Sequence, residues 1–469
     1  MSRYTAATDH DRREMLAAIG VASIEELFDA QIPAAVRLGR ELELPAGLPE
    51  QDVFEHLREL AGRNTSAEDE ISFLGGGMYD HYVPALIDML VERSEFLTPY
   101  TPYQPEVSQG GLQVMFEYQT AISELTGLPV ANASVYEGPS ALAAAGWLAR
   151  QANGRARFVI SAGCHPHAIE TLRTTAHGYG AEVVEVPLRD GVTDPGEWAA
   201  AIDAETSAVF FQNPNFLGAV EDAEALAAAA KDSPAVVVGS YDPVALGILR
   251  PPGECGVDIA VGVGQPLGNR LDFGGPSFGY FAATEAYLRK MPGRIAGETR
   301  DVDGRRGFVL TLQTREQHIR REKATSNICT AQALNALGGV VYLTWLGRRG
   351  LVELGELLLQ RTAYARERLT ALDGVEALHE QPVIREFALR LDAPVERVIA
   401  RCQDAGVNPG LALPDRGLLV ALTERRTRAH IDRLADVLGA AVAAEREAAG
   451  TAPPGVAEPA GAAGGGRAA

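Results

Sequence analysis

Between about residues 134 and 283, short apolar segments alternate with stretches of helical pattern. The helical stretches include 140–153 and 166–176. The segments are rich in β-branched and aromatic residues, and we predict strands at Phe158–Ser161, Val183–Val186, Ala208–Phe211, Ala235–Val238, Ile259–Gly262 and Phe278–Ala282. A strand that is apolar along nearly its whole length is buried on both faces, and the intervening helices supply the cover. This pattern predicts a mainly parallel sheet with helices on both faces.

The sequence as a whole suggests four parts. They are a helical N-terminal arm (1–70), a large α/β domain (71–344), a smaller C-terminal α/β domain (345–446) and a disordered tail (447–469). The smaller domain is expected because two further strand patterns alternate with two helical ones. They are strands at Glu386–Leu391 and Leu418–Leu422 and helices at Val395–Ala405 and Thr427–Ala444. The tail is rich in Pro, Gly and Ala, a composition that cannot build a core.

Local signals predict several helix ends. Ser23 with Glu26 has the spacing of a capping box at a helix start. Pro84 suits the first turn of a helix, where its missing N–H costs nothing. A helix from about Leu112 to Leu125 would be closed by Gly127.

Charge and composition exclude several classes of function. The net charge of −20 disfavours a nucleic-acid partner, and no apolar run is long enough to span a membrane. The first ten residues lack the apolar core of a secretion signal. The four cysteines lie far apart with no CxxC pair, so we expect a reduced, metal-free, cytoplasmic protein.

Lysine is scarce in this chain. Only Lys231, Lys290 and Lys323 occur among 42 basic residues. Any lysine-dependent chemistry therefore has three candidates.

Residues 94–110 are dominated by three prolines at spacings of three: Pro99, Pro102 and Pro105. Each proline fixes φ and removes a backbone donor, which predicts an extended, rigid segment. An ordinary surface linker is the alternative. Two tyrosines, Tyr100 and Tyr103, make a plain linker the weaker interpretation.

This segment and three other stretches together resemble one family. The others are LGGGMYDHYVP (74–84), FEYQTAISELTG (116–127) and QTREQHIRREKATSNICT (313–330). The chain resembles, over about residues 1–446, the glycine dehydrogenase (aminomethyl-transferring) family, the P-protein of the glycine cleavage system. In that family the enzyme is either one long chain with two related halves or two separate subunits, and this length is similar to the separate first subunit. The resemblance implies the aspartate-aminotransferase-like fold (PLP fold type I).

Such a fold binds pyridoxal phosphate (PLP) through a lysine Schiff base. The family resemblance places a His-Lys pair eight residues after the aspartate that opens one strand. Here Asp258 opens that strand, and Gln265-Pro266 stands at the expected position. Proline has no amine, so we expect no covalent PLP on this chain.

Two further residues complete the predicted vestigial cofactor pocket. Asp242 stands where a partner for the pyridine nitrogen is expected, although it would equally suit the cap of a turn. In the turn before the helix at 140, Glu137 adds negative charge and Pro139 removes an N–H, and both disfavour phosphate.

Weaker interpretations remain open. Lys323, in a predicted basic helix opened by Thr314 and Gln317, would be the replacement nucleophile of an autonomous PLP enzyme. The run from Gly262 to Gly268 has one residue too many for a dinucleotide fingerprint. His165 and His167 lack a third metal ligand and are expected to cap or line a helix start.

The resemblance implies a role beside a partner. The partner, subunit 2, would carry PLP, decarboxylate glycine and pass the aminomethyl group to the lipoyl arm of the H-protein, in a heterotetramer of two pairs. This chain would complete the partner's active-site cleft; a purely structural scaffold subunit is the alternative. The residues predicted to contribute to the cleft are Tyr100, Tyr103, Gln104, Gln109, Arg315 and His318.

Overall fold

The computed structural model describes residues 6–451. The chain forms two compact units, divided between Thr65 and Ser66. The strands expected for the large domain and those expected for the smaller domain all lie in the second unit. The predicted boundary between these two domains, at residues 344 and 345, therefore remains a prediction.

The first unit is helical. It contains α1 (Asp9–Ile19), α2 (Ile24–Gln31), the short 3-10 helix η1 (Ala34–Val36) and α3 (Glu50–Ala61). The Ser23 side chain caps α2 by accepting from the backbone N–H of Glu26. The Glu26 carboxylate, however, accepts from the N–H of Ala22. The predicted reciprocal capping box is therefore only half formed.

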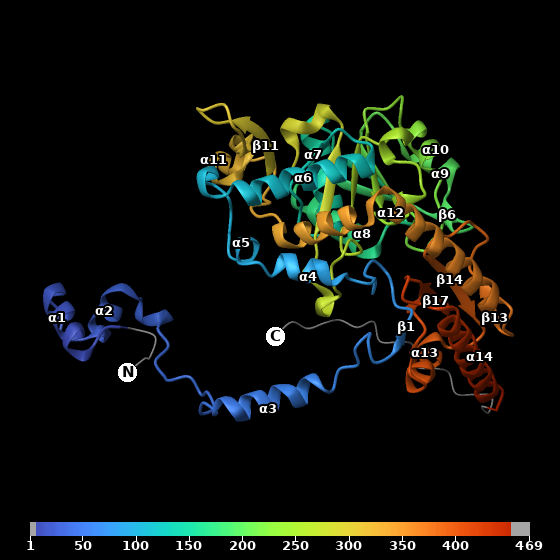
Figure 1. Ribbon diagram of the computed structural model, residues 1–469, viewed down its shortest axis with the longest axis horizontal. Coiled ribbons are helices and arrows are strands. Elements are labelled where there is room, and N and C mark those ends of the chain that lie inside the picture. The colour runs from blue at the N-terminus through green and yellow to red at the C-terminus, as the bar shows by residue number, and fades with distance from the viewer. Residues whose placement is uncertain (1–5, 452–469) are drawn as a thin grey trace. The chain divides into compact units, whose positions relative to one another are not determined.

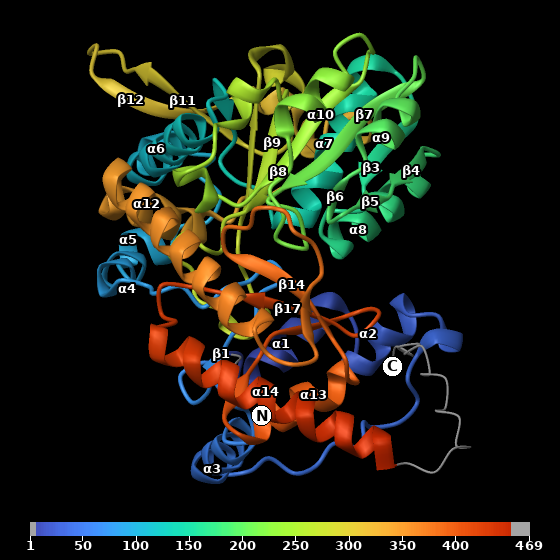
Figure 2. The same cartoon turned by 90° about the vertical axis from the view of Figure 1, so that its right-hand side faces the viewer.

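The second unit is built on a seven-stranded sheet (Figure 2). In spatial order its strands are β2 (Val130–Ala131), β10 (Gly279–Ala283), β9 (Ile259–Val263), β8 (Val236–Tyr241), β7 (Thr206–Asn213), β3 (Arg157–Ser161) and β4 (Glu182–Val186). The five strands from β9 to β4 are parallel, and β10 is antiparallel to both of its neighbours. All six predicted strands and the mainly parallel sheet are confirmed.

Helices lie on both faces of this sheet (Figure 1), and alternate residues of its strands pack against the two helical layers. Phe158 and Phe210 pack with α7 (Gly138–Asn153) and α8 (Pro166–Gly178). Their sequence neighbours, among them Phe211, pack on the other face. That face is covered by α9 (Pro195–Ala201), α10 (Ala223–Ala229), α6 (Gln109–Thr126) and α12 (Ala333–Thr370). Burial on both faces explains why the strands are apolar throughout.

A second sheet of four strands follows α12. Its order is β13 (Val375–Ala377), β14 (Glu386–Leu391), β17 (Gly417–Ala421) and β16 (Leu411–Leu413), and every pair is antiparallel. The helices α13 (Val395–Asp404) and α14 (Arg428–Thr451) pack with it. The predicted strands and helices are confirmed, but α14 continues into the segment predicted as disordered. The remainder of that predicted tail, 452–469, lies outside the described residues.

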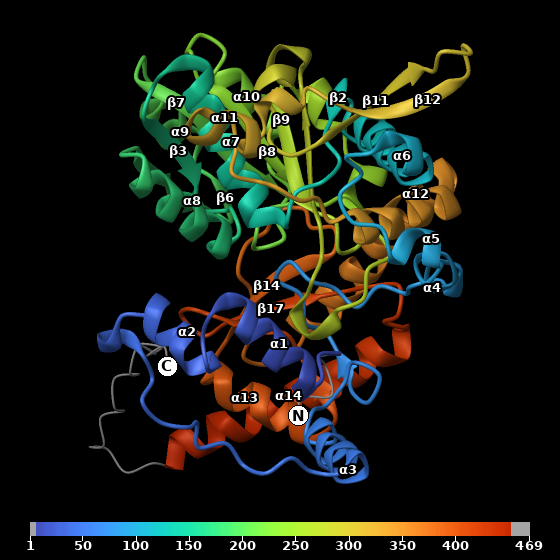
Figure 3. The ribbon, with the colours of Figure 1, turned by 90° about the vertical axis from the view of Figure 1, so that its left-hand side faces the viewer.

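Several connecting elements differ from expectation. Pro84 is the N-cap of α4 (Ala85–Val91) instead of a first-turn residue. Gly127 closes α6 in a left-handed conformation, as predicted. The sequence pattern missed the long helix α12, which is broken at Gly347. It also missed the projecting hairpin of β11 (Ile295–Arg300) and β12 (Arg306–Thr311) (Figure 3).

The predicted basic helix opened by Thr314 and Gln317 is wrong. The segment instead forms three short turns, η7 (Gln313–Arg315), α11 (Gln317–Arg320) and η8 (Arg321–Lys323). Arg321 has a φ of 55°, which interrupts a helix, and neither predicted residue makes a capping bond. Residues 313–323 do not form one continuous helix, because contacts with neighbouring segments determine their backbone conformation.

The remaining short elements are α5 (Ser94–Leu97), β1 (Ile71–Ser72) with β15 (Val407–Asn408), β5 (Leu188–Arg189) with β6 (Val192–Thr193), η2 (Pro105–Val107), η3 (Ala245–Gly247), η4 (Pro252–Cys255), η5 (Asp272–Gly274) and η6 (Glu285–Lys290). Among the described residues, no helix combines the length and apolar character that crossing a membrane requires.

Candidate functional site

A cavity of about 640 Å³ opens at the carboxyl ends of the parallel strands. The segments after β3, β7, β8 and β9 line it, which is where ligands bind in open α/β sheets. The glycine run Gly75–Gly77 and the start of β14 complete its wall. All four residues of the predicted vestigial pocket lie at or beside this cavity: Glu137, Asp242 and Pro266 line it, and Gln265 is the neighbour of Pro266.

The centre of the cavity wall is an ion pair between Arg385 and Asp242. The Arg385 guanidinium lies 2.7 Å from one carboxylate oxygen of Asp242, and the other oxygen accepts from the N–H of Val244 at 3.0 Å. Arg385 is 3% exposed, donates to Nε2 of His81 at 2.6 Å and stacks 3.4 Å above the ring of Tyr79. Both oxygens of Asp242 are therefore already engaged, one by a cation and one by a turn.

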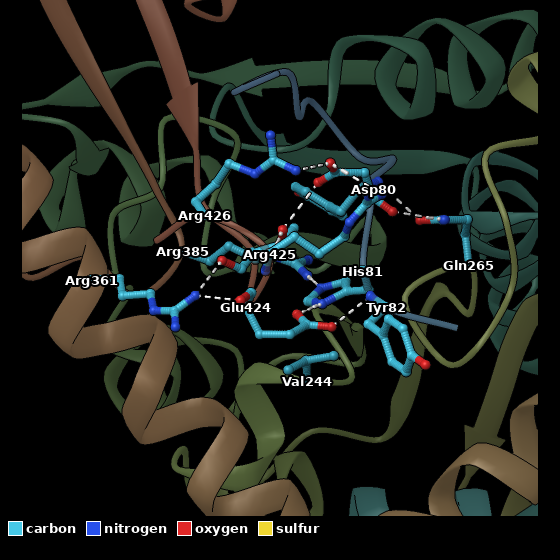
Figure 4. Close-up of polar contacts among 12 residues, drawn as sticks. Asp80, His81, Tyr82, Val244, Gln265, Arg361, Arg385, Glu424, Arg425 and Arg426 are labelled. Carbon is cyan, nitrogen blue, oxygen red and sulfur yellow. Dashed lines mark hydrogen bonds and ion pairs between the residues drawn. The ribbon is translucent and has the colours of Figure 1, made fainter. Parts of the chain in front are cut away.

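Arg385 also belongs to a chain of polar contacts that runs through His81 to Glu424 (Figure 4). His81 Nδ1 lies 2.5 Å from a carboxylate oxygen of Glu424, whose other oxygen accepts from the N–H of Tyr82 at 2.6 Å. Because Nε2 accepts from Arg385, Nδ1 carries the imidazole proton and donates to Glu424. The loop after β17 thus fixes residues Met78–Tyr82, which we call the MYDHY segment, against the cavity wall.

A second buried pair holds the same segment. Asp80 lies 2.7 Å from the Arg426 guanidinium and accepts from the Thr423 hydroxyl at 3.0 Å. Burial raises the pKa of the Asp80 carboxyl, and Arg426 opposes that shift. The segment is therefore fixed by charges on both sides.

Gln265 has a structural role in this arrangement. Its amide oxygen accepts from the N–H of Tyr79, and its amide nitrogen donates to the carbonyls of Tyr79 and Asn269, all at 2.9 Å. The side chain is completely buried. It joins the MYDHY segment to the loop after β9.

Tyr79 and Glu386 also line the cavity. The Tyr79 hydroxyl donates to Glu386 at 2.5 Å, and the other carboxylate oxygen accepts from the N–H of Gly76 at 2.7 Å. Burial raises the pKa of Glu386, with the Arg385 charge opposing the shift. A Cβ at Gly75 would lie 2.2 Å from the Glu386 carboxylate, so this approach requires glycine.

The residues present do not fit PLP held as a Schiff base. The Glu137 carboxylate caps α7 by accepting from the N–H of Ser140 at 3.1 and 3.3 Å, so an acid occupies the helix N-terminus that would bind phosphate. Pro266 lines the cavity, and no lysine is among the described residues that do. Asp242 is paired with Arg385 and is not available to a pyridine nitrogen.

The three lysines lie elsewhere. Lys231 is exposed just beyond α10, and Lys323 is exposed in η8. Lys290 is half-buried and donates to the carbonyl of Gln151 at 3.2 Å.

His165 caps the start of α8, as predicted. Its Nδ1 accepts from the N–H of His167 at 3.1 Å, and its Nε2 donates to the carbonyl of Gly76 at 2.7 Å. Burial lowers the pKa of His165. Within residues 6–451, no group of three or more His, Cys, Asp or Glu side chains is arranged to hold a metal.

The predicted cleft residues lie in a separate place, at the proline segment. Tyr103 accepts a hydrogen bond from the Arg294 guanidinium at 3.0 Å, and its ring meets His318 edge-on at 5.6 Å. Glu316 lies 3.8 Å from Arg294, and both side chains are buried. The structure thus brings two of the predicted residues, Tyr103 and His318, into contact.

Gln109 and Arg315 are engaged by the backbone. The Gln109 amide makes a pair of bonds, both 2.8 Å, with the N–H and carbonyl of Phe308. Arg315 donates to the carbonyls of Leu312, Met291 and Gly293.

Tyr100 and Gln104 remain exposed on the segment, Tyr100 by 83%. Neither side chain makes a hydrogen bond within the described residues.

Sequence reasoning missed Arg385, Glu386, Tyr79 and Arg294. Arg385 and Glu386 carry a usable signal, because two adjacent charges stand at the start of a mostly apolar strand pattern. Arg294 carries none, since a single arginine between Gly293 and Ile295 looks like any surface cation.

The chain is similar to known proteins over most of its length. The glycine cleavage system P-protein family matches residues 2–438. The probable glycine dehydrogenase (decarboxylating) subunit 1 of Geotalea uraniireducens is 48% identical over 445 residues, covering 94% of this chain and 100% of that protein. A crystal structure of glycine decarboxylase (P-protein) in inhibitor-bound form superposes with a TM-score of 0.87 at 44% identity, covering 94% of this chain and all of the other.

A more distant structure supports the fold alone. A C-DES variant with glycine covalently linked to its PLP cofactor has a TM-score of 0.59 at 14% identity, covering 84% of this chain and 99% of that chain. The predicted PLP fold type I is thereby confirmed. With a family match that spans nearly its full length, the chain belongs to the glycine cleavage system P-protein family.

Proposed function

We propose that this chain is subunit 1 of a two-subunit glycine dehydrogenase and that it carries no covalent PLP. The observation that supports this most directly is Pro266 in the wall of a cavity that no described lysine lines. The name of the related protein, subunit 1, supports the existence of a second subunit. Two further observations support the absence of covalent PLP: Glu137 caps the helix that would bind phosphate, and Asp242 is paired with Arg385.

In this proposal subunit 2 binds PLP in the cytoplasm, and two subunit pairs form a heterotetramer. PLP supplies the electron sink for the decarboxylation of glycine, and the aminomethyl group then passes to the lipoyl arm of the H-protein. The contribution of this chain is to shape the cleft around that site.

The proline segment is the part that we infer to reach the partner's cleft. Its backbone is stiffened by Pro99, Pro102 and Pro105, so its side chains are presented at little cost in conformational entropy. Arg294 and His318 fix the ring of Tyr103, whereas Tyr100 and Gln104 remain exposed for contact with partner or substrate.

The deciding experiment compares the chain purified alone with the chain co-expressed with subunit 2. We expect the chain alone to be colourless and inactive, and the complex to show PLP absorbance and glycine-dependent carboxyl exchange. A borohydride-reducible adduct on Lys231, Lys290 or Lys323 of the chain alone would instead establish an autonomous enzyme. Any of these adducts would overturn the proposal, and one on Lys323 would identify that lysine as the nucleophile.

Replacement of Tyr103 tests the contribution of the segment. Tyr103→Ala removes both the hydroxyl and the ring and is expected to lower exchange activity about 10²-fold, because misplacing a positioning group has effects of this size. Assembly should be unchanged, as judged by size-exclusion chromatography. The matched control is Tyr82→Ala, another exposed tyrosine, which lies outside the segment. Equal kinetics for the Tyr103 variant and the unaltered complex would favour a purely structural scaffold.

A further inference from the structure

A group of cations without ion-pair partners lies next to the proline segment. Residues 289–323 contain ten Lys and Arg against five Asp and Glu, a net charge of +5 in a chain of net charge −20. The exposed cations of this range include Arg289, Arg320, Arg321 and Lys323. Within the described part of the chain none of these four has an ion-pair partner, and we call them, together with Lys290, the basic surface.

Two separate segments are held together to form this surface. Arg315 donates to the carbonyls of Met291 and Gly293, which joins the segment after η6 to η7. Gln151 accepts from Lys290 and donates to the carbonyl of Thr325 at 3.4 Å, which joins the same segment to the residues after η8. The cations therefore share one surface although they are thirty residues apart.

The contact between Tyr103 and His318 places the proline segment at the edge of this surface. Ile319, 49% exposed, adds an apolar side chain among the cations. Like charges gathered on one surface repel each other, and an oppositely charged partner relieves that repulsion. An acidic protein face is the chemistry that fits.

We propose that the basic surface is the docking site for an acidic face of the lipoyl-bearing carrier protein. This inference rests on the proposed function, since it places the carrier next to the segment that reaches the cleft. Docking through opposite charges would speed encounter and weaken with rising ionic strength.

The test uses the assembled two-subunit enzyme with Arg289, Arg320 and Arg321 each replaced by Ser. Glycine decarboxylation is measured against carrier concentration and, separately, with free lipoamide as the acceptor. We expect the KM for the carrier to rise about tenfold at low salt with kcat unchanged. The rate with free lipoamide should not change, and the difference in KM should shrink as salt is added.

A second triple variant controls for total charge. Arg13, Arg348 and Arg390 are exposed and have no ion-pair partner among residues 6–451, so replacing them with Ser changes the net charge equally. This variant should keep the original KM. An equal rise in both variants, or an unchanged KM in the first, would overturn the basic surface as the docking site. An assembled enzyme without any glycine-dependent exchange would overturn the proposed function itself.

Discussion

Replacing Arg385 with Met is expected to lower the free energy of unfolding by about 3–5 kcal/mol. The substitution leaves the Asp242 carboxylate, whose side chain is 14% exposed, without its cation, and removes a donor from His81 and the stacking on Tyr79. An uncompensated buried charge costs far more than the pair itself contributes. Urea unfolding followed by the fluorescence of the buried Trp198 measures the change.

Two matched variants make this result interpretable. Arg270→Met removes one partner of a pair with Asp88 whose side chains are 54% and 41% exposed, and it should cost about 0–1 kcal/mol. Adding Asp242→Asn to Arg385→Met should recover part of the loss, because no charge is then left unpaired. If Arg385→Met and Arg270→Met shifted the urea midpoint equally, the pair would not hold this region together.

Gly218→Ala is the second substitution with a large expected effect. Gly218 has a φ of +86°, and a Cβ there would lie 2.0 Å from the carbonyl oxygen of Glu386 in β14. Backbone cannot move aside as a flexible side chain can, so the loop after β7 and the four-stranded sheet would have to separate. We expect a loss of stability about 3 kcal/mol greater than the strain of a left-handed alanine alone.

Gly154→Ala provides the comparison. Gly154 has a φ of +73° at the end of α7, and a Cβ there meets nothing within 4 Å. It therefore reports the conformational cost by itself, about 1–2 kcal/mol. Similar urea midpoints for the two alanine variants would mean that the contact between Gly218 and Glu386 is not tight in solution.

The periodicity of the sequence was sufficient for the two sheets because burial on both faces leaves a strong local signal. Each predicted strand of the large sheet begins and ends within three residues of the observed one, and Phe158 and Val159 face opposite layers as the pattern requires. The basic helix failed for the opposite reason. Residues 313–323 are too short and too polar for a periodic signal, so neighbouring structure sets their backbone.

The residues of the candidate site also differ in how far the sequence alone could predict their roles. Pro266 and Glu137 could be predicted to disfavour PLP from their chemistry alone, since a missing amine and an added carboxylate need no partner to be recognised. The turn cap formed by Asp242 was one of the predicted alternatives, but its pairing with Arg385 and the role of Gln265 could not be predicted. Asp242 pairs with Arg385 and Gln265 bonds the backbone of Tyr79, each more than a hundred positions away, and no local pattern encodes that distance.

The sequence by itself therefore determined the α/β class, the strands and the absence of an amine at Pro266, because these depend on local periodicity and on side-chain chemistry. Only the tertiary structure decided that Arg385 takes up Asp242, that Arg294 fixes Tyr103, and that cations thirty residues apart share one surface. Those features arise from contacts between segments distant in the chain, where specificity comes from the geometry of packing.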